Sequence, residues 1–230
     1  MTIPRYAIYY APEPSSALHD LGSTWLGRDA VTGAARQQPT VRDLSADDLT
    51  RLTSDARRYG LHATLKAPFQ LADGRCEADL LDHAAEIARK IAPFDAPPLT
   101  LTDLGGFRAL TLSRHSDAMT TLERTCVLAL EPMRAPLTMA DRQRRRPDRL
   151  SDRQRQILDQ VGYPFSLEEF RFHITLSQRL SDAEAALIDP ALAAHVAPVV
   201  GAAWTVDCIS IFRQPASGEP FLELARFALG

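Results

Sequence analysis

The residues of this chain whose types and spacing could support catalysis are a histidine and a threonine that occur twice in the same order. The tetrapeptide H-x-T-L stands at residues 62–65 and again at 173–176, each time inside a strand-like run. Because alternate side chains of a strand point to one face, the histidine and the threonine of each copy project together. For one strand, such a polar row is most simply the solvated side of a half-buried antiparallel strand. Two copies in the same order favour a shared chemical role.

Two imidazoles, two hydroxyls and a nearby cation suit an in-line displacement at phosphorus without a metal. Near neutral pH, a neutral imidazole can take a proton from an attacking water while a protonated one gives a proton to the leaving oxygen. Threonine hydroxyls and a Lys or Arg can donate hydrogen bonds to the non-bridging oxygens, where negative charge develops in the transition state. The pattern therefore predicts acid–base catalysis on a phosphate ester.

Four further side chains are candidates for substrate binding. Strand alternation places Lys66 on the face of the first motif and Arg171 on the face of the second. Lys66 is one of only two lysines in an arginine-rich chain, which favours a specific role as a compact charge for phosphate. Tyr59 and Trp25 could stack on a base or close over a sugar, although lone aromatic residues more often belong to a core or a cleft wall.

Paired H-x-T motifs separated by about half the chain resemble the 2H phosphoesterase superfamily, which includes cyclic nucleotide phosphodiesterases and 2′,5′-RNA ligase-like proteins. The surrounding sequence is similar to a bacterial, DUF1045-like branch that is associated with phosphonate-utilisation operons. The similarity extends over nearly the whole chain. It is carried by RYAIYY at 5–10, WLGRD at 25–29, RYGLHATLK at 58–66 and EFRFHITL at 169–176.

The resemblance implies a bilobal α+β fold with approximate two-fold symmetry, in which antiparallel sheets line a central cleft. We expect a single bilobal domain over residues 1–230, each lobe supplying one H-x-T strand, with the lobe boundaries left open. By resemblance, His62 and His173 are the acid and the base, in an order that the sequence does not decide, and Thr64 and Thr175 contact the phosphate. The implied enzyme is a phosphodiesterase without metal or other cofactor. It would hydrolyse a small cyclic phosphodiester of a nucleoside or of ribose, with a place in phosphonate metabolism.

Composition agrees with an enzyme of modest size that acts on a small substrate. The net charge is −3 and the sequence pI is near 6.1, so the chain has no general attraction for duplex nucleic acid. The cysteines are odd in number and widely spaced, which argues against a disulfide framework or a zinc site and for a reducing compartment. With no signal peptide pattern and no apolar run of the ~20 residues that a membrane span needs, we expect a cytoplasmic protein without a membrane partner. The oligomeric state is left open.

The pattern of elements is α+β and lacks the strict alternation of a doubly wound sheet. Expected helices begin near the caps Ser15 or Ser16, Ser45 and Ser181. The remaining expected elements are a strand at 6–10, helices at 77–91, 116–131 and two within 137–161, and strands at 98–103, 106–113, 203–213 and 220–228, besides the two motif strands.

One charged segment stands apart from the motifs. Residues 142–155 contain seven arginines, which could form a basic rim for a phosphorylated substrate. Such a run is more often a solvated helix face with local partners, here the aspartates at 141, 148 and 152, and this interpretation is favoured.

Three rival functions share parts of the same pattern. A metal-dependent hydrolase could use the two histidines as ligands, but the sequence supplies no third and fourth ligands near them, and threonine is a poor zinc ligand. A non-catalytic phosphate-binding module would not need both histidines, because Lys and Arg suffice to bind an anion. An RNA end-processing 2′,3′-cyclic phosphodiesterase or 2′,5′-ligase-like enzyme would share the chemistry but would need a broader basic groove.

Overall fold

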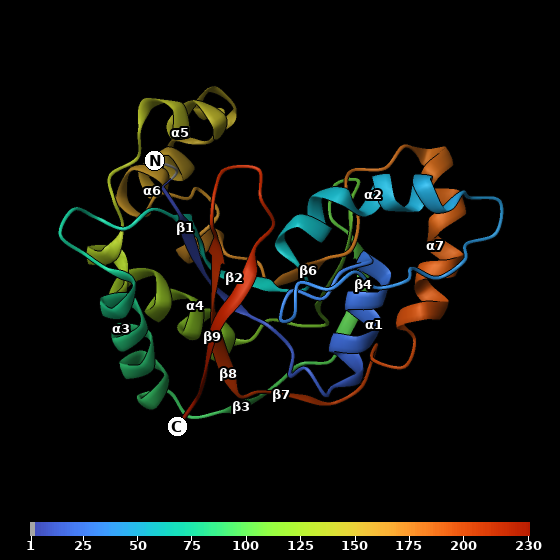
Figure 1. Cartoon of the computed structure of the whole chain (residues 1–230), viewed down its shortest axis with the longest axis horizontal. Coiled ribbons are helices and arrows are strands. Elements are labelled where there is room, and N and C mark those ends of the chain that lie inside the picture. Colours follow the sequence, from blue (N-terminus) through green and yellow to red (C-terminus); the bar gives the residue numbers. More distant parts are fainter. Residues whose placement is uncertain (1–2) are drawn as a thin grey trace.

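The computed structural model of the chain describes residues 3–230 (Figure 1). The strands are β1 (Arg5–Tyr10), β2 (Ala63–Phe69), β3 (Phe94–Ala96), β4 (Leu99–Asp103), β5 (Arg108–Leu112), β6 (His173–Thr175), β7 (Trp204–Val206), β8 (Cys208–Gln214) and β9 (Leu222–Ala228). The α-helices are α1 (Ala17–Leu26), α2 (Ala46–Tyr59), α3 (Glu77–Arg89), α4 (Asp117–Ala129), α5 (Met139–Arg144), α6 (Asp152–Val161) and α7 (Asp182–Val196). Short 3₁₀ turns lie at η1 (Glu131–Met133), η2 (Pro147–Arg149) and η3 (Leu167–Glu169).

Seven strands form one sheet in the order β4-β5-β6-β2-β1-β8-β9, and neighbouring strands are antiparallel. The two motif strands, β2 and β6, are neighbours at its centre and pair only at Ala63 and Ile174. β2 is flanked on its other side by β1 and β6 by β5. The sheet thus has two halves that meet at the motifs, and the predicted α+β class is confirmed.

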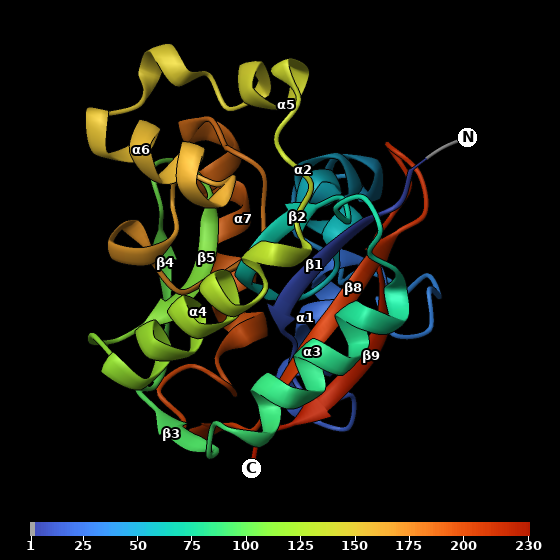
Figure 2. The ribbon, with the colours of Figure 1, turned by 90° about the vertical axis from the view of Figure 1, so that its left-hand side faces the viewer.

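Alternation along β1 explains how this sheet buries both of its faces. Tyr6, Ile8 and Tyr10 point into the large core of the molecule, whereas Ala7 and Tyr9 belong to a smaller apolar cluster on the opposite face. On the large-core side, α3 packs on β8 and β9, and α4 packs on β2 (Figure 2). Helix α1 packs against both α2 and α7. The helices therefore hold the motif strands in place through the large core.

The helix starts follow local chemistry. The hydroxyls of Ser16, Ser45 and Ser181 each accept a hydrogen bond from a backbone N–H in the first turn of the helix that follows. Such caps satisfy donors that have no partner within the helix. The predicted starts of α1, α2 and α7 are confirmed.

Two short strands differ from the expected pattern. β3 and β7 pair with each other in a separate two-stranded sheet, and the expected strand at 203–213 is divided between β7 and β8. β3 has only three residues and lies between Pro93 and Pro97-Pro98. Such a segment is too short to show the alternation from which strands are predicted.

Candidate active site

The pairing of β2 with β6 places both motifs on one face of the sheet. Ala63 and Ile174, the middle residues of the motifs, face each other and are fully buried in the core. In an antiparallel pair, opposite residues share a face and successive residues alternate. The histidine of each motif therefore lies opposite the threonine of the other, and all four side chains point away from the large core.

His62, Thr64, His173 and Thr175 line a single cavity of about 640 Å³. The two histidines occupy diagonal positions across the strand pair, for which the residues are typically about 7 to 8 Å apart and the Cβ atoms somewhat closer. That spacing leaves room for a phosphorus atom and its two in-line oxygens between the imidazole rings.

Backbone carbonyls fix the tautomer of each imidazole in the same way. Nδ1 of His62 lies 2.9 Å from the carbonyl oxygen of Gly60, and Nδ1 of His173 lies 2.8 Å from that of Arg171. A carbonyl can only accept, so Nδ1 carries the proton in both rings and Nε2 is left free to gain or lose one. The Thr64 hydroxyl donates to Nε2 of His62 over 3.3 Å.

Burial favours the neutral form of both imidazoles. Burial, opposed by the Gly60 carbonyl and aided by the charge of His173, lowers the pKa of His62 to about 4. Burial also lowers the pKa of His173, opposed by the Arg171 carbonyl. The His62 ring lies against Tyr9, with ring centroids 3.8 Å apart, while Phe107 meets the His173 ring edge-on at 6.0 Å. An anionic ligand would favour protonation of one of the two rings.

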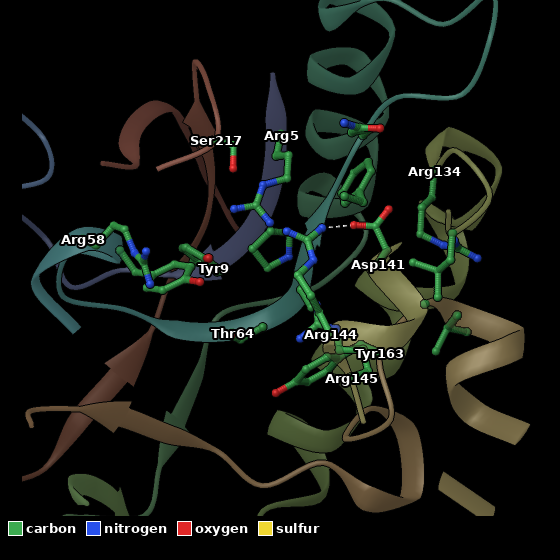
Figure 3. A pocket seen from close by; sticks show the side chains of 18 of the residues that line it. Arg5, Tyr9, Arg58, Thr64, Arg134, Asp141, Arg144, Arg145, Tyr163 and Ser217 are labelled. Carbon is green, nitrogen blue, oxygen red and sulfur yellow. Dashed lines mark hydrogen bonds and ion pairs between the residues drawn. The ribbon is translucent and has the colours of Figure 1, made fainter. Parts of the chain in front are cut away.

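Arginines from four parts of the chain surround the same cavity (Figure 3). They are Arg5 on β1, Arg58 on α2, Arg134 after η1, and Arg144 and Arg145 at the end of α5. Their charge gives this acidic chain a locally basic cavity, as an anionic ligand requires.

Of the other predicted binding residues, Tyr59 lies at the cavity and Arg171 beside it. Tyr59 lines the cavity and stacks on Phe221, with ring centroids 5.1 Å apart and an interplanar angle of 19°. Arg171 is exposed and lines a second cavity of about 620 Å³, which shares Thr64 and His173 with the first. This second cavity also contacts four aromatic residues and a buried acid, namely Phe107, Tyr163, Phe165, Phe170 and Glu123.

The prediction that Lys66 faces the site is wrong, because a β-bulge interrupts the alternation of β2. Tyr9 of β1 pairs with Thr64 and Ile8 pairs with Lys66, so Leu65 is an extra residue in the ladder. The bulge turns Lys66 toward the large core, where it is 2% exposed. Its ammonium group donates to the Val127 carbonyl over 2.9 Å and pairs with Glu131 at 2.8 Å. Burial lowers the pKa of Lys66 and the Glu131 pair opposes that effect.

Trp25 is likewise a core residue and not a cavity wall. It is fully buried in α1, and its indole N–H donates to the carbonyl of Leu176 over 2.9 Å. Leu176 directly follows the second motif, so Trp25 helps to hold the end of β6. Its position on the buried face of an amphipathic helix is the ordinary reason for a large aromatic side chain there.

The arginines of the segment 142–155 are of two kinds: some belong to a solvated helix face and others line the cavity. Arg142, Arg153 and Arg155 form ion pairs with Asp159, Glu168 and Asp152, as a solvated helix face would. Arg144 pairs with Asp141, also as the favoured interpretation expected, but both Arg144 and Arg145 line the cavity, as the alternative interpretation proposed. Arg5, Tyr9 and Tyr163 also line it and were not predicted, because only the folded chain brings them to the motifs.

Two further observations bear on the class of protein. Among the part of the chain that the structure describes, no three His, Cys, Asp or Glu side chains are grouped as a metal site would require. Within that same part, none of the helices is both long and apolar enough to cross a bilayer.

The two H-x-T strands adjoin at the centre of an antiparallel sheet, and their polar side chains line one cavity. The resemblance to two-histidine phosphoesterases implied such an arrangement. The family model described as "Protein of unknown function (DUF1045)" matches residues 64–222. The chain belongs to the DUF1045 family.

Two curated proteins, each named ribose 1,5-bisphosphate phosphokinase PhnN, are similar in sequence. The protein of Janthinobacterium sp. (strain Marseille) is 36% identical over 226 residues, and that of Laribacter hongkongensis (strain HLHK9) is 35% identical over 218 residues. The alignments cover 96% and 94% of this chain and 50% of each relative. The chain thus spans about half the length of the curated relatives it matches.

Solved structures with low sequence identity align along the whole chain. The protein TT0787 of Thermus thermophilus is 17% identical with a TM-score of 0.47, and the alignment covers 98% of this chain and 97% of that one. Escherichia coli LigT in its apo form is 16% identical with a TM-score of 0.48, covering 100% and 99% of the two chains. LigT complexed with 3′-AMP is also 16% identical, with a TM-score of 0.47 and coverage of 99% and 98%.

Proposed function

We propose that this protein is a phosphoesterase that hydrolyses a small cyclic phosphodiester of a nucleoside or of ribose by two-histidine acid–base catalysis. The observation that carries the proposal is the diagonal placement of His62 and His173 across one strand pair, each with Nδ1–H held by a carbonyl and Nε2 left unprotonated. Hydrogen bonding at Nδ1 orients an imidazole for proton transfer at Nε2. A polar strand face without catalytic function would not need this matched arrangement.

His62 is assigned as the general base, because burial holds its pKa at about 4 and keeps the imidazole neutral. Its Nε2 takes a proton from water as the water oxygen forms a bond to phosphorus. On the opposite side, the bond from phosphorus to one ring oxygen of the substrate breaks, and Nε2–H of His173 gives a proton to that oxygen. The product is a phosphomonoester with a free neighbouring hydroxyl, and the two histidines have exchanged their protonation states.

The remaining motif residues serve the phosphate itself. Thr64 and Thr175 point to the same cavity and can donate to the non-bridging oxygens, whose negative charge grows as the new bond forms. The anionic substrate also raises the pKa of a neighbouring imidazole, so the acid is protonated in the complex although burial disfavours its charge in the free protein.

The curated relatives support a ribosyl phosphate as the substrate class. Both are named as kinases for ribose 1,5-bisphosphate, and this chain aligns with half of their length. We do not assign the kinase activity of these relatives to this chain. We propose that the substrate of this chain is a related phosphorylated ribose. A place in phosphonate metabolism belongs to the same proposal.

A nucleoside cyclic phosphate is the second candidate substrate, and the second cavity favours it. That cavity adjoins His173, the proposed acid, and its aromatic walls offer faces on which a base could stack. An enzyme that processes RNA ends would use the same cavity for its terminal base. Comparison of nucleoside and ribose cyclic phosphates in one assay separates these substrates.

The test is a hydrolysis assay in EDTA with nucleoside 2′,3′-cyclic phosphates and ribose cyclic phosphates. His62→Ala and His173→Ala should each lower kcat about 10² to 10⁴-fold, the usual cost of losing a general acid or base. His83→Ala is the matched control, since the His83 ring also bonds a carbonyl, that of Asp79, but lies outside the cavity. Near-full activity of either motif variant would refute the mechanism, and loss of activity in EDTA that Zn²⁺ or Mn²⁺ restores would favour the metal-dependent rival.

A further inference from the structure

Two of the arginines at the cavity have no carboxylate partner among residues 3–230. Arg58, Arg134 and Arg144 are ion-paired with Asp55, Glu131 and Asp141. Arg5 instead donates to the neutral amide of Gln214 over 2.8 Å and 2.5 Å, and Arg145 lies over the Tyr163 ring at 4.8 Å. Both arginines are partly buried residues that line the cavity.

Tyr9 connects these two arginines with the first motif. Its ring lies against His62, and its hydroxyl is buried without a hydrogen-bond partner in the described part of the chain. Burial raises the pKa of Tyr9, as does Tyr59, while the charges of Arg5 and Arg145 act in the opposite direction. Arg5, Tyr9 and Arg145 thus line the same cavity as His62.

Apart from its contact with the Tyr163 ring, Arg145 has no ion-pair partner in the described part of the chain. Arg145 directly follows α5. Neither α5 nor the following turn η2 contains a buried side chain. An unpaired guanidinium there gains no ion pair from the protein, whereas two guanidinium groups match the charge and geometry of a phosphomonoester dianion. The cavity, at about 640 Å³, is large enough for a sugar with two phosphate groups.

We propose that Arg5 and Arg145 form a subsite for a second phosphate, so that the substrate is a cyclic phosphate whose sugar also carries a separate phosphomonoester. This inference rests on the proposed function and narrows it. The cyclic phosphate lies between the two motifs, and the phosphomonoester lies beyond Tyr9 on the His62 side. Substrates without the second phosphate leave the two arginines unpaired and are bound more weakly.

The experiment compares paired substrates that differ only in the second phosphate. One pair is adenosine 2′,3′-cyclic phosphate with and without a 5′-phosphate, and the other is ribofuranose 1,2-cyclic phosphate with and without a 5-phosphate. The protein should prefer the phosphorylated member at least tenfold in kcat/KM, mostly through KM. Arg145→Gln and Arg5→Gln should each reduce this preference to less than threefold. Arg146→Gln, which changes an exposed neighbour that does not line the cavity, should preserve it.

The possible results separate this subsite from the catalytic proposal. No preference in the unmodified protein, or a preference that survives in both cavity variants, would overturn the subsite. If no cyclic phosphate is hydrolysed at all, the proposed function fails, and calorimetric binding of ribose 5-phosphate against ribose then decides the subsite alone. Binding of ribose 5-phosphate that is lost in Arg145→Gln and kept in Arg146→Gln would support it, whereas no binding, or equal binding in both, would refute it.

Discussion

At the scale of single residues, the environments of the two histidines separate their roles. His62 lies between Thr64 and an aromatic wall formed by Tyr9, Tyr59 and the residues behind them, whereas His173 adjoins the second cavity. The wall covers part of the His62 ring and disfavours its charged form. Identical motifs thus have different surroundings, which come from neighbours that neither motif contains.

This difference predicts how each variant responds to the leaving group. On bis(4-nitrophenyl) phosphate the leaving oxygen needs little help from an acid, so His173→Ala should lose less than about tenfold in kcat/KM relative to the unmodified protein. His62→Ala should keep most of the 10² to 10⁴-fold loss expected for a missing base. Hydrolysis rates of this ester and of a cyclic phosphate check the assignment. The reverse pattern would exchange the two roles.

At the scale of elements, the β-bulge in β2 decides which residues reach the site. It turns Lys66 into the core under α4 and lets Ala67 line the cavity. The positive charge near the phosphate then comes from arginines on β1, α2 and α5. A substitution that removes the Lys66 charge should therefore affect stability and not catalysis.

Lys66→Met is expected to destabilise the fold by about 1 to 3 kcal/mol, because it leaves the Val127 carbonyl without its donor and removes a partner of Glu131. kcat/KM per folded molecule should change less than threefold. Lys90→Met is the control, since Lys90 is exposed and its pair with Glu86 contributes little. Urea unfolding and the hydrolysis assay measure the two effects. A large loss of kcat with unchanged stability would return Lys66 to the site.

The sequence predicts features that depend on a few neighbouring residues better than features that depend on distant parts of the chain. The H-x-T repeat and the caps at Ser16, Ser45 and Ser181 are local signals, and the structure places them as predicted. The burial of Lys66 could not be predicted, because it depends on one extra residue in a ladder formed with β1. Arg145 was missed for a similar reason, since a run of arginines does not show which of them face a cavity.

At the scale of the whole molecule, the half-buried histidines link the site to stability. Burial depresses the pKa of His62 in the folded chain from 6.5 to about 4. A depressed pKa contributes stability that is present above the unfolded value, near 6.5, and is lost as the pH falls through about 4. The fold therefore becomes less stable in acid partly because it keeps this imidazole neutral.

His62→Gln should consequently lose less stability than the unmodified protein between pH 7 and pH 4. Thermal unfolding midpoints over this range would show the two curves converging toward acid. His83→Gln, outside the cavity, should follow the unmodified protein at every pH. Parallel curves for His62→Gln would mean that His62 is not buried as the structure places it.

The pairing of β2 with β6 at Ala63 and Ile174 has a consequence for the direction of the reaction. An antiparallel pair has a local two-fold axis, so two identical motifs present equivalent groups to the two sides of one phosphorus atom. In the proposed mechanism, the two imidazoles hold after one turnover the protons that the reverse step requires. By microscopic reversibility, that mechanism also closes a cyclic phosphate from a monoester and a neighbouring hydroxyl, and the concentration of water and the energy of the ring decide which direction prevails.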